Sequence, residues 1–227
     1  MTFSYIFNQN EFNMLMALAG YDKLFGLFFN TIDFSDNSAG YIFNKLYNDK
    51  ILEKTADGFV IASAVQKIIN SVGEFEHCII INSTDDFLSS LCCYIKNGQV
   101  TVISKVNVSN NKINISSFTV NQFIDYLSEN SYLPKSDSCI DFDNERLSEF
   151  EKSIDFDNNT DDNILLSAMI YSGSNLSVPM CKVFLIRHYL FDYILVKSSG
   201  FVERKLYTKD NYMLIIENIV FRGEKWL

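Results

Sequence analysis

The feature that most constrains the fold of this chain is an internal repeat that links its middle to its end. Residues 91–127 alternate between apolar and polar positions as strands do, and a helical pattern then opens at Thr119. Residues 180–216 follow the same order, with a second helical pattern opening at Thr208. A constant offset pairs Cys92 with Cys181, Val106 with Leu195, Asn111 with Gly200, Thr119 with Thr208, and Phe123 with Tyr212. A repeat of this kind predicts two similar halves.

Local signals support the strands and helix of the first copy. Asn97-Gly98 favours the two positive φ values of a type I′ turn between antiparallel strands. A second turn is expected at 109–111. Thr119 and Gln122 have capping-box spacing, which marks the start of a helix. The predicted buried face of that helix is Val120, Phe123, Ile124 and Leu127.

The region before the first copy has mixed periodicity. We expect a short strand or packed arm at 3–7 and a hairpin around Ala56-Asp57-Gly58, where Asp-Gly favours a tight turn. In the helix that opens at Asp36 or Ser38, Tyr41 is expected to face inward with Ile42 and Leu46. The remaining predicted elements are helices at 10–19, 22–29 and 63–72 and a buried strand at 77–81.

Two helices are predicted between the copies. The first runs from 144 to 154 with Leu147, Phe150 and Ile154 on one side. The second runs from 161 to 171, because its apolar residues recur at helical spacing and acids occupy its first turn. The second copy then turns at 198–200 and ends in a strongly apolar helix at 209–221.

The net charge of −9 is concentrated in this middle connection. Residues 129–163 hold 11 acidic against 3 basic side chains, whereas the last quarter of the chain is mildly basic. No polybasic stripe exists, which argues against nucleic acid and against an anionic membrane surface as partners. An acidic, solvated connection is the favoured interpretation.

The five cysteines and the apolar runs bear on the compartment. The count is odd, no CxxC occurs, and several cysteines lie in apolar runs, as buried reduced thiols do. No signal peptide is recognisable, and no apolar run approaches the roughly 20 residues that span a bilayer. A cytoplasmic protein is expected.

Candidate catalytic and metal-binding groups are few. The stretch Asp155–Asp161 resembles the start of an EF-hand loop, but Leu166 stands where the bidentate glutamate belongs. His77 and Cys78 are neighbours on a predicted strand and so point to opposite faces. The chain contains no nucleophile-elbow, phosphate-loop, dinucleotide-binding or zinc-protease motif. We therefore expect no enzyme, no cofactor, no metal and no small-molecule substrate.

Helices followed by a small hairpin are also the order of a winged-helix DNA-binding unit. The recognition helix would be 38–49, offering Asn44, Lys45 and Asn48. Asp36 and Asp49 flank it, and no arginine precedes Arg146, so the charge does not suit DNA. A winged-helix regulator is retained as an alternative function.

The order of features resembles the EspG family of type VII (ESX) secretion chaperones. The resemblance is carried by YIFNKLYNDKILEKTADGFVIASAVQKII, LCCYIKNGQVTVIS, FTVNQFIDYL followed by Pro134, and FDYILVKSSGFVERKLYTKDNYMLIIENI. It implies pseudo-twofold halves and a non-catalytic cytosolic adaptor for a helical secretion substrate. The composition, rich in Asn, Ile and Lys, suggests a low-GC Firmicute source with WXG100-like or LXG-type substrates.

The resemblance also implies where the partner is contacted. The residues carried over are Lys96, Asn97, Gly98 and Gln99 at the first hairpin tip, and Leu147, Phe150, Glu151 and Ile154 on the helical segment. The family loop at the hairpin is long, whereas Asn97-Gly98 makes a tight turn, which shifts weight to the helical segment.

These observations together predict an α+β protein with two pseudo-symmetric halves, 1–134 and 135–227, that share a mostly antiparallel central sheet flanked by helices. The predicted function is a chaperone or adaptor that binds a helical type VII secretion substrate. An immunity protein that neutralises a co-encoded toxin is the other alternative, in which the acidic face would mimic a substrate.

Overall fold

One antiparallel sheet of nine strands forms the centre of the computed structural model, which describes residues 4–21, 25–26, 36–107, 110–138, 143–156, 161–189 and 191–222. The strand order is β1-β7-β6-β5-β4-β8-β9-β10-β11. The strands are β1 Ser4–Asn8, β4 His77–Ser83, β5 Leu91–Lys96, β6 Gln99–Asn107, β7 Asn110–Thr119, β8 Ile164–Ser172, β9 Cys181–His188, β10 Phe191–Ser198 and β11 Phe201–Leu206. The predicted fold class, α+β with an antiparallel central sheet flanked by helices, is confirmed.

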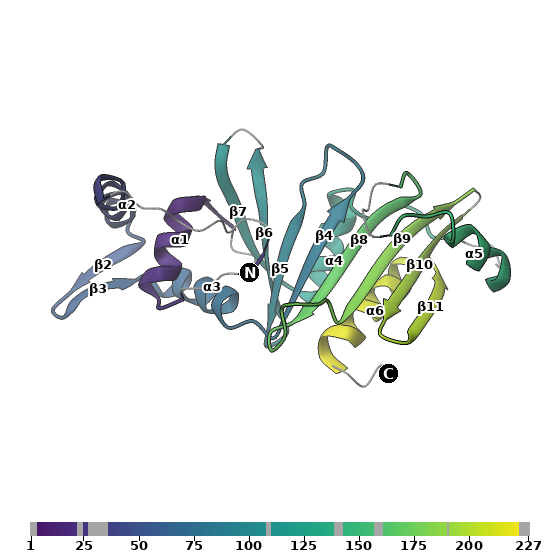
Figure 1. The fold of residues 1–227 in the computed structure, drawn as a ribbon. Coiled ribbons are helices and arrows are strands. Elements are labelled where there is room, and N and C mark those ends of the chain that lie inside the picture. The colour runs from purple at the N-terminus through teal and green to yellow at the C-terminus, as the bar shows by residue number, and fades with distance from the viewer. Residues whose placement is uncertain are drawn as a thin grey trace.

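Six helices and a separate hairpin flank the sheet in the described part of the chain. They are α1 Gln9–Leu18, α2 Asp36–Asn48, α3 Ser63–Gly73, α4 Val120–Glu129, α5 Asn144–Glu151 and α6 Lys209–Arg222, with the hairpin β2 Leu52–Thr55 and β3 Gly58–Ile61. Figure 1 shows α1, α2 and the hairpin at one end of an elongated molecule and α5 at the other. None of the described helices is both long enough and apolar enough to cross a membrane.

The sheet is arranged symmetrically about its two central strands. β4 pairs with β8, and each is followed outward by three antiparallel strands: β5, β6 and β7 on one side, and β9, β10 and β11 on the other. The central ladder includes Ile80 opposite Met169. The exception to the symmetry is β1, which pairs with the outer edge of β7 and has no counterpart beyond β11 among the described residues.

A single row of paired residues crosses all nine strands and shows this symmetry. From β1 to β11 the row is Tyr5, Ile115, Ile103, Cys92, Ile80, Met169, Lys182, Lys197 and Val202. Side chains alternate between the two faces of a strand, so residues paired in one row share a face. The row is therefore a direct comparison of the same surface in the two halves.

The two faces of the sheet are covered differently. On one face α4 and α6 cover both halves, with Phe123 and Tyr212 fully buried in one continuous apolar core. On the other face α1, α2 and α3 cover the first half through residues such as Leu15, Leu46 and Ile69. The second half of that face holds a smaller core, in which α5 packs on β9 and β10.

Most predicted local signals are confirmed. Thr119 caps α4 in a capping box with Gln122, and Asn97 and Gly98 both have positive φ, at 50° and 72°. The N–H of Asn211 donates to Oγ1 of Thr208 at 3.0 Å, so Thr208 occupies the place in α6 that Thr119 occupies in α4. The buried face predicted for α4 is buried throughout.

The helix predicted at 161–171 is wrong, because this segment forms β8, one of the two central strands. β8 lies between β4 and β9, and its two faces contribute to different cores, with Leu166 and Ala168 on one side and Met169 on the other. A strand buried on both faces has a nearly continuous apolar run. Periodicity alone cannot distinguish such a run from a buried helix.

The constant offset between the repeats is also wrong in its details. Cys92 pairs with Ile80 and Lys182 pairs with Met169, so Lys182 is the counterpart of Cys92, and Cys181 lies on the opposite face. The two copies have hairpins of different length, which shifts the match within each hairpin.

The prediction that Tyr41 faces inward is wrong, since 72% of this residue is exposed.

Two predicted elements fall partly outside the described residues. The short helix predicted at 22–29 is one, since only residues 25–26 of it are described. The turn predicted at 109–111 is the other. Asn107 pairs with Asn110, and β7 has therefore begun at Asn110.

Candidate partner-binding site

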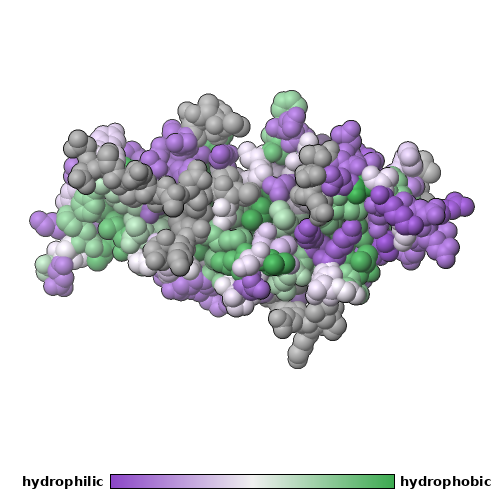
Figure 2. All heavy atoms as spheres, viewed as in Figure 1, coloured by the Kyte–Doolittle hydropathy of each residue, from purple (hydrophilic) through white to green (hydrophobic). Residues whose placement is uncertain are grey.

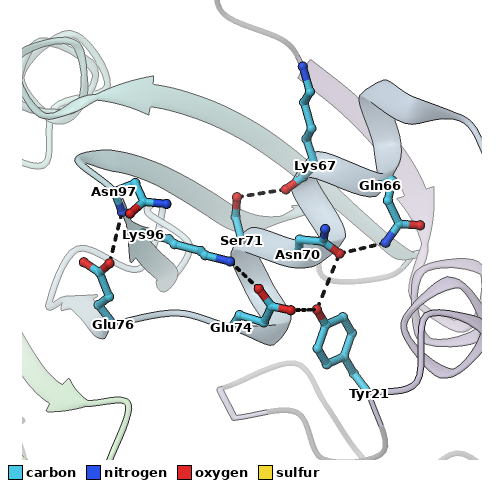
Figure 3. A network of polar contacts seen from close by, with 9 residues as sticks. All are labelled: Tyr21, Gln66, Lys67, Asn70, Ser71, Glu74, Glu76, Lys96 and Asn97. Atoms are coloured by element: carbon cyan, nitrogen blue, oxygen red, sulfur yellow. Dashed lines mark hydrogen bonds and ion pairs between the residues drawn. The ribbon is translucent and has the colours of Figure 1, made fainter.

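The first predicted contact, the tip of the β5–β6 hairpin, is tied to the end of α3 by polar contacts. Lys96 forms an ion pair with Glu74, and the N–H of Asn97 donates to Oε1 of Glu76 at 3.4 Å (Figure 3). Asn97 and Gln99 are exposed, whereas Lys96 and Gly98 are half-buried. The tip is therefore a short, braced turn.

Tyr21 extends this polar network at the end of α3 (Figure 3). Its hydroxyl donates to Oε1 of Glu74 at 2.7 Å and also contacts Oδ1 of Asn70 at 3.4 Å. Burial, helped by Glu74, raises the pKa of Tyr21 to about 12. Hydrogen bonds from Lys96 and Tyr21 lower the pKa of Glu74. The Tyr21 ring lies where a Cβ on Gly73 would be, so this approach requires a glycine.

The second predicted contact, α5, is capped by Asp143, whose side chain accepts a hydrogen bond from the N–H of Glu145 at 2.9 Å. Leu147 of α5 and Ile154, which follows the helix, are buried against β9 and β10, 2% and 7% exposed. Both residues were predicted to contact the partner. In this structure they anchor α5 on the sheet instead of forming a free surface.

Glu151, also among the predicted contacts, forms a buried polar cluster at the end of α5. Arg204 of β11 donates to both of its carboxylate oxygens, at 2.8 and 2.7 Å, and the Tyr193 hydroxyl donates to Oε1 at 3.2 Å. Glu151 is 8% exposed. Burial, reinforced by the Glu151 carboxylate, raises the pKa of Tyr193 well above its usual value. Two-point pairing of this kind fixes both position and orientation, so it locks α5 to β11.

Phe150 is the predicted α5 contact that reaches the surface. Its ring meets the His188 ring edge-on at 4.8 Å and lies 6.0 Å from that of Tyr189. His188 also contacts Phe191 at 4.9 Å. Tyr189, at the tip of the β9–β10 hairpin, is 87% exposed. We call Phe150, His188, Tyr189 and Phe191 the aromatic tip.

The aromatic tip is missing as a unit from the sequence prediction, which identified Phe150 alone. The run His188-Tyr189-Leu190-Phe191 next to a turn was the available signal. Figure 2 shows that the end of the molecule bearing α5 is otherwise mostly hydrophilic. An exposed aromatic cluster in polar surroundings is typical of a protein-binding surface.

The two predicted contacts do not form one surface. The β5–β6 tip lies at the end of the sheet where His77 pairs with Ile95 and Ser172. The aromatic tip lies at the opposite end, where Ile164 pairs with Ile186. Phe87, 96% exposed in the loop between β4 and β5, is at this second end as well. The structure therefore groups α5 with the β9–β10 hairpin.

Other polar side chains that the sequence offered as candidates form hydrogen bonds or ion pairs within the fold. Asp85 accepts a hydrogen bond from the N–H of Phe87 at 2.9 Å within its loop. Lys45, proposed for a DNA-recognition helix, is paired with Glu11 at 2.5 Å and with Asp49 at 3.4 Å. Residues 157–160 of the calcium-loop-like stretch lie outside the described residues. Across the described ranges, no three acidic, His or Cys side chains gather as a metal site would need.

The cysteines of the described chain are buried free thiols. Cys78 and Cys92 lie on neighbouring strands with their sulfurs 3.7 Å apart, and Cys92 also contacts the Tyr94 hydroxyl at 3.2 Å. Burial raises the pKa of Cys93, and that of Cys181 to about 12. Thiols held protonated in this way are poor nucleophiles and poor metal ligands.

Comparisons with known proteins give a match in structure alone. No protein-family model matches the chain, and no curated protein matches it in sequence. Thirteen chains of solved structures match it in fold. One is the Mycobacterium tuberculosis type VII secretion system chaperone EspG5, solved in complex with a PE25–PPE41 dimer. The match covers 98% of both chains with a TM-score of 0.62 at 9% sequence identity. At this identity the likeness establishes the fold alone.

Proposed function

We propose that this protein is a non-catalytic chaperone that binds a helical type VII secretion substrate before export. The observation that carries the proposal is the fold match to a type VII secretion chaperone along 98% of both chains. Because the match covers nearly the whole of each chain, it extends over both halves and the α5 segment and is not limited to the central sheet. WXG100-like or LXG-type proteins are the substrates we expect.

We propose the aromatic tip as the main contact. Aromatic residues that combine large apolar area with few rotatable bonds dominate the binding energy of many protein interfaces. Tyr189 and Phe150 offer such area beside exposed acidic side chains of α5, among them Glu145 and Glu149. A helix with an apolar stripe flanked by basic residues would suit this surface.

The buried residues of α5 have a supporting role in this proposal. Leu147, Ile154 and the Glu151–Arg204 pair hold the helix in place, so that Phe150 is presented at a fixed position. The β5–β6 tip, Lys96 to Gln99, remains a predicted second contact at the other end of the sheet. A partner that touches both would have to extend along the sheet.

The test is a pull-down of the tagged protein from a lysate of its own organism, with mass spectrometry of the proteins that co-elute. We expect a small helical secretion protein, retained by the native chain and lost with Tyr189→Asp and with Phe150→Asp. Tyr189 is almost fully exposed, so its substitution is expected to leave folding intact even if Phe150→Asp does not. Thermal unfolding of each variant checks this.

Tyr41→Asp is the matched control, because Tyr41 is another highly exposed tyrosine at the far end of the molecule. Loss of the partner with Tyr41→Asp but not with Tyr189→Asp would move the contact away from the aromatic tip. Recovery of a toxin catalytic domain as the specific partner would replace the chaperone proposal by immunity. Duplex DNA as the only ligand would exclude both.

A further inference from the structure

The outer edge of β11 is an open place in an otherwise symmetrical sheet. In the row that crosses the sheet, Ile115 of β7 and Val202 of β11 occupy equivalent places, each on the third strand outward from the central pair. Beyond Ile115 lies Tyr5 of β1. No strand formed by the described residues lies beyond Val202. Ile115 is fully buried, whereas Val202 is 49% exposed.

The backbone of β11 is oriented to accept another strand. The N–H of Tyr207 donates to the carbonyl of Asp192. This bond identifies the residues of β11 whose backbone groups bond to β10. In an antiparallel pair the bonded residues alternate with residues whose N–H and C=O groups point away. Val202 and Arg204 are in the second class, so their backbone groups point away from β10. Unpaired groups of this kind form a template for an added strand.

The charged residues of β11 do not protect this edge as edge charges commonly do. Lys205 pairs with Glu203 at 3.0 Å, and Arg204 is held by Glu151. These charges are therefore neutralised within the molecule. Next to Val202 in the row, Lys197 places its ammonium 3.3 Å from the centre of the Phe156 ring. An incoming side chain would meet the apolar side chain of Val202, with the Lys197–Phe156 contact on its far side.

We infer that β11 binds an extended segment of a partner protein as a tenth strand, antiparallel to β11 and in the place that β1 fills in the first half. The segment is uncharged and carries an aromatic or β-branched residue opposite Val202, as Tyr5 stands opposite Ile115. This site is separate from the helix-binding role proposed for the aromatic tip. It does not depend on that role.

A partner segment fits this edge better than β1 of a second copy. Phe7 is 2% exposed, and Asn8 caps α1 in a capping box with Glu11, so β1 is anchored in its own chain. Releasing β1 would expose this core and the α1 cap. Strand addition by a foreign peptide, in contrast, requires no rearrangement of the described elements.

The test uses a fluorescein-labelled heptapeptide with the sequence of residues 2–8, titrated with the intact protein and followed by fluorescence anisotropy. This probe carries the chain's own strand pattern, with its tyrosine in register with Val202. We expect saturable binding in the micromolar to millimolar range. We expect binding at least tenfold weaker for Val202→Pro, which removes an outward N–H, and for a peptide with aspartate in place of tyrosine.

Leu214→Asp is the matched control, because Leu214 on α6 is 46% exposed, close to the exposure of Val202. Its affinity for the peptide should be unchanged. Hydrogen exchange gives an independent measurement, in which the amides of Val202 and Arg204 become protected when the peptide is bound. This readout concerns the native protein and therefore does not depend on how Val202→Pro folds.

Three results would overturn the inference. The first is no binding at millimolar peptide, and the second is protection that appears on β1 instead of β11. The third is a concentration-dependent dimer of the protein alone that Val202→Pro abolishes, since this would make a second copy the occupant. A failure here leaves the pull-down with Tyr189→Asp unaffected, so the two proposals are judged separately.

Discussion

The same row of residues has a different character in the two halves of the sheet. In the first half Cys92, Ile103 and Ile115 are fully buried beneath α1, α2 and α3. In the second half their counterparts are Lys182, Lys197 and Val202, all at least partly exposed. The strand arrangement is the same, so the covering elements make the difference. The second half is the open one, and the aromatic tip and the β11 edge both lie on it.

The hairpin tips show the same contrast. Each half has a helix before its central strand that contacts the first hairpin tip. The residues that directly follow α3 hold its tip at the surface, by an ion pair through Glu74 and a hydrogen bond through Glu76. α5 holds its tip through Phe150 and stays in place through the buried Glu151–Arg204 pair. Exposed ion pairs contribute little to stability, whereas breaking a buried pair is costly.

The largest expected effect comes from making the first half resemble the second. Ile103 and Lys197 are counterparts in the row, so we compare Ile103→Lys with Lys197→Ile. Ile103→Lys places an unpaired ammonium in a dry core, which should lower the free energy of unfolding by about 5 kcal/mol. Lys197→Ile removes the cation–π contacts to Phe156 and Phe184 on a partly exposed surface and should cost about 1 kcal/mol or less. Urea unfolding of both variants measures the difference, and equal losses would refute the contrast between halves.

The next effect in size concerns the ion pairs that hold the two helices. Arg204→Met leaves the Glu151 carboxylate buried without its cationic partner, and we expect a loss of about 3 kcal/mol in the free energy of unfolding. Lys96→Met removes the surface partner of Glu74 and should not change the urea midpoint measurably. If both variants unfolded at the same urea concentration, the two helices would be held equally strongly.

Two glycines test how rigid the junction between the halves is. A Cβ on Gly173, at the end of β8, would overlap the backbone carbonyl oxygen of Phe75, and the Gly173 N–H donates to the Glu76 carbonyl at 2.8 Å. Backbone cannot move aside easily, so Gly173→Ala should cost about 2 kcal/mol in unfolding free energy.

Gly73→Ala provides the comparison, since the atoms nearest to its Cβ belong to the side chain of Tyr21. We expect a smaller loss, and one that largely disappears in a Tyr21→Ala background, as a double-mutant cycle by thermal unfolding would show. A Gly73→Ala cost that persists without the tyrosine ring would mean that the backbone itself is strained there.

The smallest effect is a pH dependence of the β5–β6 tip. Lys96 and Tyr21 lower the pKa of Glu74 in the folded state, so the carboxylate contributes stability above its unfolded pKa, about 4.3. This contribution is lost as the pH falls through the lower folded value. The amide chemical shifts of Asn97 and Gly98 should therefore differ between native protein and Glu74→Gln at pH 7. The two spectra should converge only as the pH falls well below about 4.3, where the folded Glu74 takes up its proton, and convergence already at that pH would contradict the lowered pKa.

The sequence predicts those parts of the fold that depend on neighbouring residues. Thr119 with Gln122, and Asn97 with Gly98, each specify a local backbone geometry whatever surrounds them. β8 is different, because its identity depends on β4 and β9, which hydrogen-bond to its two edges and are distant in the sequence. Its run from Ile164 to Ile170 satisfies a helical spacing equally well.

The candidate site shows the same limit. Phe150 was accessible to prediction as an apolar residue on an amphipathic helix. Its placement against His188 and the pairing of Glu151 with Arg204 join residues far apart in the sequence, and no local pattern records them. Burial of Leu147 and Ile154 follows from the same packing. Amphipathicity shows that a helix has an apolar face, and not whether that face meets the core or a partner.

The ladder between β4 and β8 has a consequence for synthesis on the ribosome. β4 is complete at Ser83, but β8, its partner at the centre of the sheet, begins only at Ile164. Translation of the intervening residues must therefore be finished before the centre of the sheet can close. During that interval Ile79, Ile80 and Ile81 lie on a strand with one edge unsatisfied. Such an edge is prone to aggregate with neighbouring nascent chains. Slower decoding between these strands would lengthen that exposure, and a general holdase chaperone would be most needed there.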